Sequence, residues 1–453
     1  MQTKLLISLL LLLLCISACA GPQAASTPTA PAEKIEQFPE TWTPGPSHSP
    51  EIPETSEPPS TQPPRTATSS TEPPPLPTLP YPPPFQKVTT DPLIPGKEVT
   101  INSIQMSSKS TGWALGQQDD GYERVLYTQD GGHRWEDRTP PLSRVDVKSS
   151  TQKITAYFYD EDIAWVILPD LRSDPSQAEH LVWFTIDAGE TWKASEPLPV
   201  RAVEPYIFPR KFEFINQYEG WLWVHLGFEH MHDRTYLFQT RDGGKNWKRL
   251  IDPEDNGLQS LHNTGLAFAD SNLGWMTKDP LGGFDPFLEQ TINGGFNWQK
   301  ITIPPPVIGE WSELSIYCIL ENPVFSSPQT GYFLLQCAEL NQDSGNFNWD
   351  ARTTYLYATT DRGENWLIQG FPTPIHQLIF LDYQNGFAFG EQHYQSRDGG
   401  ASWNELKKVT WVGDFCFINQ QEGWAVARKG DTSALVHTAD GGQTYQQINP
   451  EAQ

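Results

Sequence analysis

Apolar and alternating runs of strand length recur along the chain from about residue 96 onward, always in the same order. A run such as 212–215 or 415–418 is followed by a small residue and an aromatic, then by a further run and a polar turn. This pattern is typical of short β-strands bounded by turns, and the region lacks convincing helical periodicity. The small-aromatic pairs are Gly112-Trp113, Ala164-Trp165, Gly220-Trp221, Gly274-Trp275, Gly331-Tyr332, Gly386-Phe387 and Gly423-Trp424.

The polar turn is an eight-residue pattern, called here the Asp turn, which occurs seven times. It has a hydroxyl side chain first, Asp or Asn third, Gly fifth and an aromatic eighth, as in Thr240 to Trp247. The copies begin at Thr128, Thr185, Thr240, Thr291, Thr359, Ser396 and Thr438. Their third positions are Asp130, Asp187, Asp242, Asn293, Asp361, Asp398 and Asp440.

Each position of the Asp turn has a structural explanation. The Asp or Asn oxygen can accept backbone N–H groups two residues further on. The fifth-position glycine tolerates a left-handed conformation, and the aromatic fills the space between neighbouring sheets. The alternative is metal binding or acid–base chemistry by the seven side chains. We prefer the turn, because it accounts for all four positions together.

One repeat unit therefore contains four strands, and seven units of about 50 residues each fill residues 96–453. Such a series predicts an all-β fold, a seven-bladed β-propeller of four-stranded antiparallel blades. The last unit has its own fourth strand after Tyr445, so ring closure need not use the N-terminus. The run 85–90 could still add a strand to the last blade.

The N-terminus has the features of an export signal over residues 1–18, with Lys4, a leucine-rich core and small residues at the end. Ile16-Ser17-Ala18-Cys19 resembles a bacterial lipobox, which predicts lipidation of Cys19. An ordinary signal peptide is the alternative. Lipidation would place the protein outside the cytoplasm, anchored to the bacterial membrane through Cys19, with inner or outer membrane left open.

Residues 19–95 form a stalk in this interpretation, because Pro, Ser, Thr and Glu dominate and aliphatic residues are scarce. Such a composition cannot bury enough apolar surface to offset the entropy of ordering. We therefore expect a disordered linker between the lipid and the propeller.

The five cysteines divide by position. Cys15 leaves with the signal and Cys19 takes the lipid. Cys318 and Cys337 fall nearly opposite each other on two strands of the fifth unit, which predicts a disulfide in an exported protein. Cys416, between Phe415 and Phe417, is most simply a small buried hydrophobic residue.

The formal net charge is −24, without a basic run, which argues against a nucleic-acid partner. The expected protein is a monomer without a cofactor. Catalytic signatures such as Gly-x-Ser-x-Gly or His-Glu-x-x-His are missing. We therefore expect a protein that is not an enzyme, although a glycosidase carboxylate pair cannot be identified from sequence.

Long segments concentrate on one predicted face of the ring, namely 169–179, 225–234, 279–289 and 336–352, and loops carry function on rigid scaffolds. That face is the predicted binding surface. Aromatics on it could contact a sugar or a peptide, or could simply pack their own loops. They are Tyr206, Phe284, Phe287, Trp311 and Trp349.

Two weak metal patterns lie on the same face. His225, His230, His232 and Asp233 are close in sequence, but their spacing matches no known metal motif. Asn346, Asn348 and Asp350 resemble part of a calcium loop without its distal Glu. We predict no metal site from either.

The Asp turns resemble the Asp-box, or BNR, repeats of sialidases, sortilin-type receptors and some glucanases. The fuller unit, Gly112 to Gly116 with Thr128 to Trp135, and its copy at 423–426 with 438–445, is most similar to the photosystem II assembly and stability factor family. That family consists of extracytoplasmic seven-bladed propellers, some lipid-anchored, that bind the tail of a membrane-complex subunit.

The resemblance implies a propeller lipoprotein that binds a protein partner and aids assembly or stability of an envelope or membrane complex. The chain departs from the family in its Pro-rich stalk, its long loops and its scattered arginines. A carbohydrate-binding or carbohydrate-active propeller, similar to the sialidases or glucanases, is the alternative. The arginine–isoleucine–proline motif of sialidases is absent from the sequence.

Overall fold

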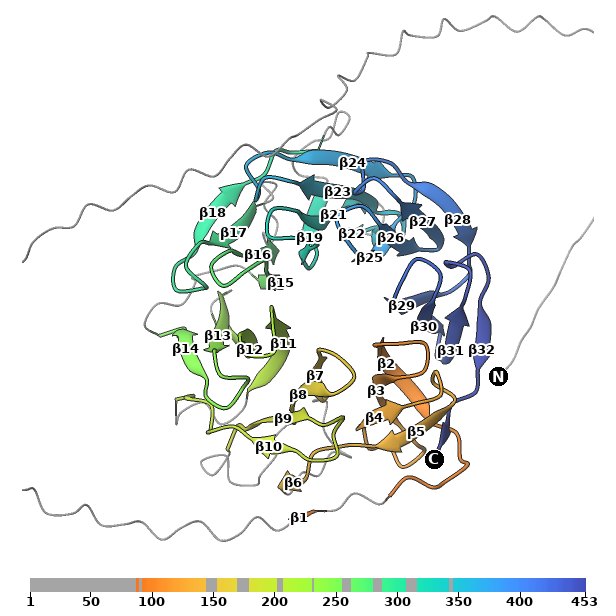
Figure 1. Ribbon diagram of the computed structural model, residues 1–453. Coiled ribbons are helices and arrows are strands. Elements are labelled where there is room, and N and C mark those ends of the chain that lie inside the picture. Colours follow the sequence, from red (N-terminus) through yellow and green to blue (C-terminus); the bar gives the residue numbers. More distant parts are fainter. Residues whose placement is uncertain are drawn as a thin grey trace, which may run out of the picture. The chain divides into compact units, whose positions relative to one another are not determined.

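The computed structural model describes residues 87–88, 92–143, 153–168, 179–201, 207–229, 232–254, 262–279, 287–306, 316–341 and 345–453. All of them belong to one compact unit that spans 81–453. This unit is a seven-bladed β-propeller, as the repeat predicts, and its blades are arranged in chain order around a ring (Figure 1). Cys19, the predicted signal and the predicted stalk up to residue 86 lie outside the described residues, so those predictions are untested. Residues 87–88 and 92–95, which were assigned to the end of the stalk, are described as part of the propeller unit, and Leu93 is buried in its core.

Each blade is an antiparallel sheet whose first strand lies nearest the ring centre and whose fourth lies at the rim (Figure 1). Blade 1 contains β2 (Thr100–Met106), β3 (Gly112–Gln117), β4 (Arg124–Thr128) and β5 (Arg134–Asp137), and blade 2 contains β7 (Thr155–Phe158), β8 (Ile163–Ile167), β9 (Val182–Ile186) and β10 (Lys193–Ala194). Blade 3 contains β11 (Phe208–Phe214), β12 (Gly220–Glu229), β13 (His232–Thr240) and β14 (Lys248–Ile251). Blade 4 contains β15 (His262–Phe268), β16 (Gly274–Asp279), β17 (Phe287–Thr291) and β18 (Gln299–Thr302).

Blade 5 is the most elaborate. Its main strands are β19 (Ile316–Leu320), β21 (Gly331–Asn341), β23 (Thr353–Thr359) and β24 (Leu367–Phe371), with β20 (Val324–Phe325), β22 (Asn346–Phe347) and the 3₁₀ turn η3 (Trp349–Ala351) added. Blade 6 contains β25 (Ile375–Phe380), β26 (Gly386–Gly390), β27 (Gln392–Ser396) and β28 (Asn404–Lys408). Blade 7 contains β29 (Val412–Phe417), β30 (Gly423–Lys429), β31 (Thr432–Thr438) and β32 (Gln446–Ile448). The described part of the chain holds no helix with the length and apolarity of a membrane span.

The C-terminal strand closes the ring. Blade 7 has its own fourth strand, β32, as expected, and the chain continues into β33 (Glu451–Ala452), which pairs in parallel with β5 of blade 1. On its other side Ala452 exchanges backbone hydrogen bonds with Gly96 and Lys97, both 2.9 Å long. The first and last parts of the propeller are therefore joined through one short strand, in which Ala452 is buried and Glu451 is exposed.

The described part of the run at 85–90 does not pair with the last blade. This part, β1 (Lys87–Val88), pairs instead with β6 (Leu142–Ser143), which follows blade 1. The alternative of an added strand on blade 7 is therefore wrong for these residues. The partner β6 lies beyond the end of blade 1, in a segment that has no counterpart in the repeat pattern.

All seven Asp turns have the same hydrogen-bond pattern, but it differs from the expected one. The carboxylate of Asp242 accepts the backbone N–H of Asn246, four residues on, at 2.9 Å, rather than a group two residues on. The hydroxyl of Thr240 accepts the N–H of Gly244 at 2.9 Å. Burial acts to raise the pKa of Asp242, but hydrogen bonds from the side chain and backbone of Asn246 hold it below its ordinary value.

Two adjacent residues of every Asp turn have positive φ. The fifth-position glycines, such as Gly244 (φ 88°), can adopt it without steric cost. The fourth position is also glycine in five turns, whereas Ala188 (φ 56°) and Arg362 (φ 67°) occupy it in blades 2 and 5. These are the two non-glycine residues with positive φ in the described part of the chain.

Five blades have a tryptophan at the start of the second strand, and three of these tryptophans bond to the Asp turn of the next blade. Trp165, Trp221 and Trp424 donate their indole N–H groups to the fourth-position carbonyls of the following Asp turn, in Gly243 (2.9 Å), Gly294 (2.9 Å) and Gly131 (3.0 Å). The two exceptions precede the turns without a fourth-position glycine. Trp113 donates to Asp160 instead, and Trp275 has no acceptor among the described residues.

The predicted bridge between Cys318 and Cys337 is present as a disulfide, and the two residues lie directly opposite each other on β19 and β21. Both cysteines are buried in the core of blade 5. Cys416 is a free, buried thiol. Burial raises the pKa of Cys416 to about 11, although a hydrogen bond with the backbone of Met106 acts to lower it. Cys416 therefore behaves as the predicted small core residue.

Candidate functional site

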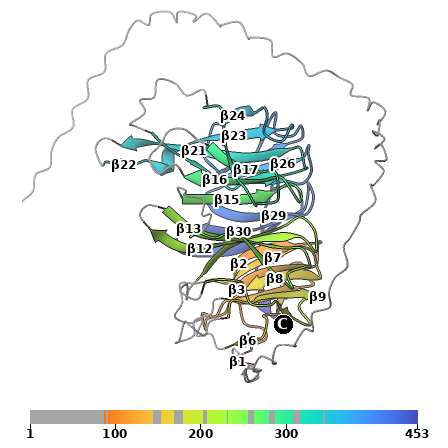
Figure 2. The ribbon, with the colours of Figure 1, turned by 90° about the vertical axis from the view of Figure 1, so that its left-hand side faces the viewer.

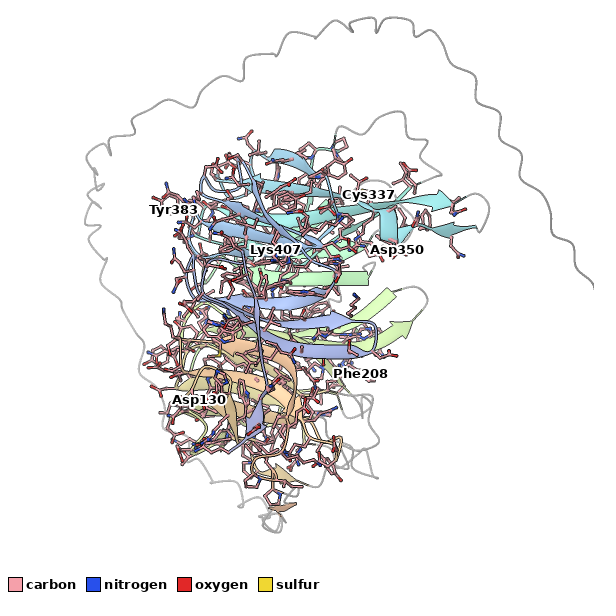
Figure 3. All side chains as sticks on the ribbon, turned by 90° about the vertical axis from the view of Figure 1, so that its right-hand side faces the viewer. Asp130, Phe208, Cys337, Asp350, Tyr383 and Lys407 are labelled. Carbon is pink, nitrogen blue, oxygen red and sulfur yellow. A yellow bond between two sulfur atoms is a disulfide. The ribbon has the colours of Figure 1, made fainter. Side chains whose placement is uncertain are left out.

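The two faces of the ring differ in the way that the loop lengths predict. Asp130 and Tyr383 lie on the face that carries the Asp turns and the short first turns, and Asp350 and Phe208 lie on the opposite face (Figure 3). Two hairpins project from that opposite face, β12–β13 and β21–β22 (Figure 2). We call it the hairpin face.

The hairpins correct two sequence predictions. Segments 225–234 and 336–352 were expected to be loops, but β12 and β13 stay paired out to Glu229 and His232. Likewise β21 continues to Asn341 and turns back into β22, which pairs with it at Leu340 and Phe347. Extended pairing gives these projections a defined backbone geometry that a free loop lacks.

Several first strands contain a β-bulge at corresponding places. The pairing register shifts between Pro209 and Lys211 in β11, between Asn263 and Gly265 in β15, and between Ile375 and Gln377 in β25. A bulge inserts one residue and changes the direction of its side chain. The inserted residues are Arg210, Thr264 and His376, so polar groups are introduced into strands that line the ring centre.

A pocket of about 510 Å³ is formed beside the β11 and β15 bulges by the first and second strands of blades 3 and 4, and by β19 of blade 5 with the residues that follow it. We call it the channel pocket. Its volume falls within the range of small-molecule and side-chain sites. It combines both signs of charge with amides and an indole, and its lining residues are Arg210, Lys211, Trp223, His225, Asn263, Thr264, Asp279, Ile319, Glu321 and Asn322.

Lys211 holds the three blades together at the pocket wall. Its ammonium donates to the carbonyl of Leu266 in blade 4 at 2.6 Å and to Oδ1 of Asn322 in blade 5 at 3.1 Å. It also forms an ion pair with Glu213 at 2.9 Å. Because an ammonium has three donors, these contacts use the full capacity of Lys211, and its charge is balanced locally.

Arg210 and His225 form a pair at another part of the lining. The guanidinium Nη2 donates to Nδ1 of His225 at 3.1 Å, across β11 and β12. His225 is buried, and Arg210 is exposed. Nδ1 of His225 therefore accepts a hydrogen bond from the positively charged guanidinium of Arg210.

The other members of the histidine pattern can be located only in part. His230 lies outside the described residues, and His232 and Asp233 are placed on β13 by their backbone alone. The described residues contain no group of three His, Cys, Asp or Glu side chains that could hold a metal ion. The metal alternative thus gains no support here.

Asp279 lies at the blade 4 side of the pocket and accepts a short hydrogen bond from the hydroxyl of Tyr317. Burial raises the pKa of Tyr317, and the bond to Asp279 raises it further, so the phenol stays protonated as the donor. The Tyr317 ring also contacts Phe347 and Trp349, with centroids 5.3 Å and 5.9 Å away. The β21–β22 hairpin is therefore packed against the pocket rim.

Glu321 differs from the other charged residues of the pocket. Its carboxylate forms no hydrogen bond and no ion pair with any described residue, although the side chain is only partly exposed. Burial raises the pKa of Glu321, while the positive charge of Arg352 acts in the opposite direction. A desolvated carboxylate without a direct partner costs stability, which makes Glu321 a candidate site residue.

Arg352 is fixed beside the pocket by contacts in blades 5 and 6. Its guanidinium donates to the side chain of Gln336, to the carbonyl of Trp349 at 2.7 Å and to Nδ1 of His376 at 2.8 Å. Desolvation lowers the pKa of His376, and Arg352 lowers it further. His376 therefore favours the neutral form that accepts this bond.

The predicted aromatic patch is only partly visible. Tyr206, Phe284 and Trp311 lie outside the described residues, and Phe287 is described only by its backbone, in β17. Trp349 lies in η3 and packs edge-on against Tyr317. This contact supports the interpretation of Trp349 as a ring that packs its own loop, and the patch as a whole stays a prediction.

A second pocket, of about 360 Å³, lies on the Asp-turn face between blades 3 and 4. Arg241, Lys248 and Phe296 are among its lining residues, and the Lys248 ammonium lies 4.4 Å from the centroid of the Phe296 ring. Its lining comes from the Asp turns of blades 3 and 4 and from residues beside the blade 3 turn. We regard the channel pocket as the stronger candidate, because charged groups from three blades converge there.

No protein-family model matches the chain, and no curated protein matches it. Among solved structures it is similar to YCF48 bound to a D1 peptide, with a TM-score of 0.47 and 16% identity over 79% of this chain and 98% of that one. For YCF48 from Cyanidioschyzon merolae the TM-score is 0.45, with 18% identity over 77% and 97%. For a GH74 enzyme from Niastella koreensis the TM-score is 0.35, with 11% identity over 79% of this chain and 64% of that one. Likeness at this level concerns the propeller fold.

Proposed function

We propose that this propeller is a binding module that holds a segment of a protein partner on its hairpin face. The observation that carries the proposal is the channel pocket, in which charged side chains of both signs from three blades converge beneath two projecting hairpins. Segments of protein chains present both charges and backbone amides, which such a lining matches. The proposed role is binding, without catalysis.

The β12–β13 hairpin supports a peptide ligand in a second way. Among the described strands, β11 pairs with β12 only as far as His225, and β14 pairs with β13 only back to Leu237. Beyond these points the backbone edges of the hairpin have no strand beside them in the described part of the chain. An extended peptide can add to such an edge through main-chain hydrogen bonds.

The proposal includes the cellular setting predicted from the sequence. A lipid on Cys19 and a Pro-rich stalk would present the hairpin face outside the cytoplasm, where the protein would assist assembly or stability of an envelope or membrane complex. The resemblance to the photosystem II assembly and stability factor family motivates this setting.

The test is co-purification from intact cells after mild crosslinking, with the tagged full chain as bait. The variant replaces 340–347 by Asn-Gly. This removes the hairpin tip at a point where the N–H of Asn348 already bonds to the carbonyl of Glu339 at 2.8 Å. The control is Tyr383→Ser, which changes an exposed residue of the opposite face.

We expect one protein complex to be enriched with the wild-type chain and with Tyr383→Ser, and to be lost with the shortened hairpin. Equal enrichment with all three baits would contradict binding on the hairpin face. Recovery of cell-wall polysaccharide without a specific protein, or hydrolysis of that polysaccharide by the purified chain, would favour the carbohydrate alternative instead.

A further inference from the structure

Glu321 provides the starting point for a statement about the chemistry of the ligand. Every other charged side chain of the channel pocket contacts a described partner: Lys211 contacts Glu213, Arg210 contacts His225, and Asp279 contacts Tyr317. Glu321 lines the same pocket without such a contact. Its carboxylate is therefore the acceptor that a ligand can use without breaking an existing bond.

The neighbouring positive charges do not occupy this acceptor. Lys211 uses its three donors on Leu266, Asn322 and Glu213. The guanidinium of Arg352 acts on Glu321 only through its charge, because its donors are directed to Gln336, the Trp349 carbonyl and His376. A cation from outside can therefore approach Glu321, whose desolvated carboxylate would gain a charge-assisted hydrogen bond.

The rest of the lining suits a long basic side chain. Trp223 and Ile319 present apolar surface to the pocket, along which the methylene stem of Lys or Arg can lie while its charged end reaches a polar group. Trp223 is 7% exposed, and its indole N–H has no acceptor among the described residues. Trp223 therefore offers the pocket only the small part of its ring that lines it, as apolar surface for the stem.

We infer that the channel pocket receives a basic side chain of the bound protein segment, with Glu321 as its counter-charge. This inference rests on the proposed function, because the basic group belongs to the partner held on the hairpin face. The overall charge of the chain, −24, would also attract a basic segment over longer distances.

The test measures binding of three blocked tripeptides to the full chain by titration calorimetry: acetyl-Gly-Lys-Gly-amide, acetyl-Gly-Arg-Gly-amide and acetyl-Gly-norleucyl-Gly-amide. Norleucine keeps the stem and lacks the charge. The variant is Glu321→Gln, and the control is Glu364→Gln, which removes one exposed carboxylate of the blade 5 Asp turn that does not line the pocket.

We expect the Lys or Arg peptide to bind at least about tenfold more tightly than the norleucine peptide, as a hydrogen bond to a charged group would provide. Glu321→Gln should abolish this preference, and Glu364→Gln should retain it. Equal binding of all three peptides, no binding, or a preference that survives Glu321→Gln would overturn the inference.

The inference and the proposed function can fail separately. If the crosslinked partner is captured by the wild-type chain and lost with the shortened hairpin, but Glu321→Gln leaves the peptide preference unchanged, the hairpin face binds protein without using Glu321 for a basic group. If the peptides bind as expected while capture does not depend on the hairpin, the pocket selects a basic group and the proposed partner surface is wrong.

Discussion

Replacing Gly244 by alanine should weaken the propeller more than the same change at a comparable glycine elsewhere. Gly244 is the fifth residue of its Asp turn, with φ 88°, and a Cβ there would lie 2.6 Å from Nε1 of Trp165 in the preceding blade. Gly121 has φ 75°, and a Cβ there would meet nothing within 4 Å. The pair of variants separates the backbone cost from the collision between blades.

The magnitudes follow from these two terms. A left-handed alanine costs about 1–2 kcal/mol, partly offset by about 0.4–1 kcal/mol from the less flexible unfolded chain. We expect Gly121→Ala to lose about 1 kcal/mol. Gly244→Ala adds a collision with a buried ring, at about 1–3 kcal/mol. It also weakens the hydrogen bond from Trp165 to Gly243, at a cost of about 1 kcal/mol. The free energy of unfolding of Gly244→Ala should therefore be lower than that of the wild type by about 3–5 kcal/mol.

The assay is equilibrium urea unfolding, followed by tryptophan fluorescence and by far-ultraviolet circular dichroism. Coincident transitions are required, because the free energy of unfolding is defined only for a cooperative process. Equal losses in the two variants would refute the reasoning, since they would show that packing between the Asp turn and the neighbouring tryptophan does not constrain the ring.

Three further predictions concern other parts of the ring. Burial lowers the pKa of His393 to about 4, so below pH 6.5 the unfolded chain gains a proton that the folded chain does not. The free energy of unfolding should therefore fall by about 3 kcal/mol between pH 6.5 and 4. In the variant His393→Gln, urea unfolding measured over the same pH range should show a smaller decline. Replacing Cys318 and Cys337 by alanine should cost about 3 kcal/mol for a separation of 19 residues, and reductant should then no longer change the urea midpoint. Truncation after Asn449 removes the strand that joins Gly96 and Lys97 to blade 1; limited proteolysis should then cut near residue 96 at least tenfold faster, and an unchanged rate would contradict this closure.

The Asp turns could be predicted from sequence because their information is local. A hydroxyl, an Asp or Asn and a glycine within eight residues are sufficient to satisfy the turn, so seven copies reveal the blades. The detailed hydrogen bonds could not be predicted, because the choice between an acceptor contact two or four residues away depends on the two successive positive-φ residues at positions such as Gly243 and Gly244.

The hairpin lengths and the channel pocket could not be obtained from the pattern. β21 is buried over Gly331 to Ala338 without alternation, so its periodicity gives no end point. Arg210 and Thr264 are inserted by bulges, which break the period-two pattern that assigns side chains to faces. Glu321 lines the same pocket as Lys211 and Asp279 only because blades 3, 4 and 5 are adjacent in the closed ring.

Site-specific photocrosslinking tests the central claim most directly. A benzoylphenylalanine is placed at position 339, exposed on β21 of the hairpin face, or at position 383, exposed on the Asp-turn face. Illumination of intact cells should join one protein to the chain labelled at 339, without the same adduct at 383. Adducts from 383 alone, or identical adducts from both positions, would contradict binding of a protein partner on the hairpin face.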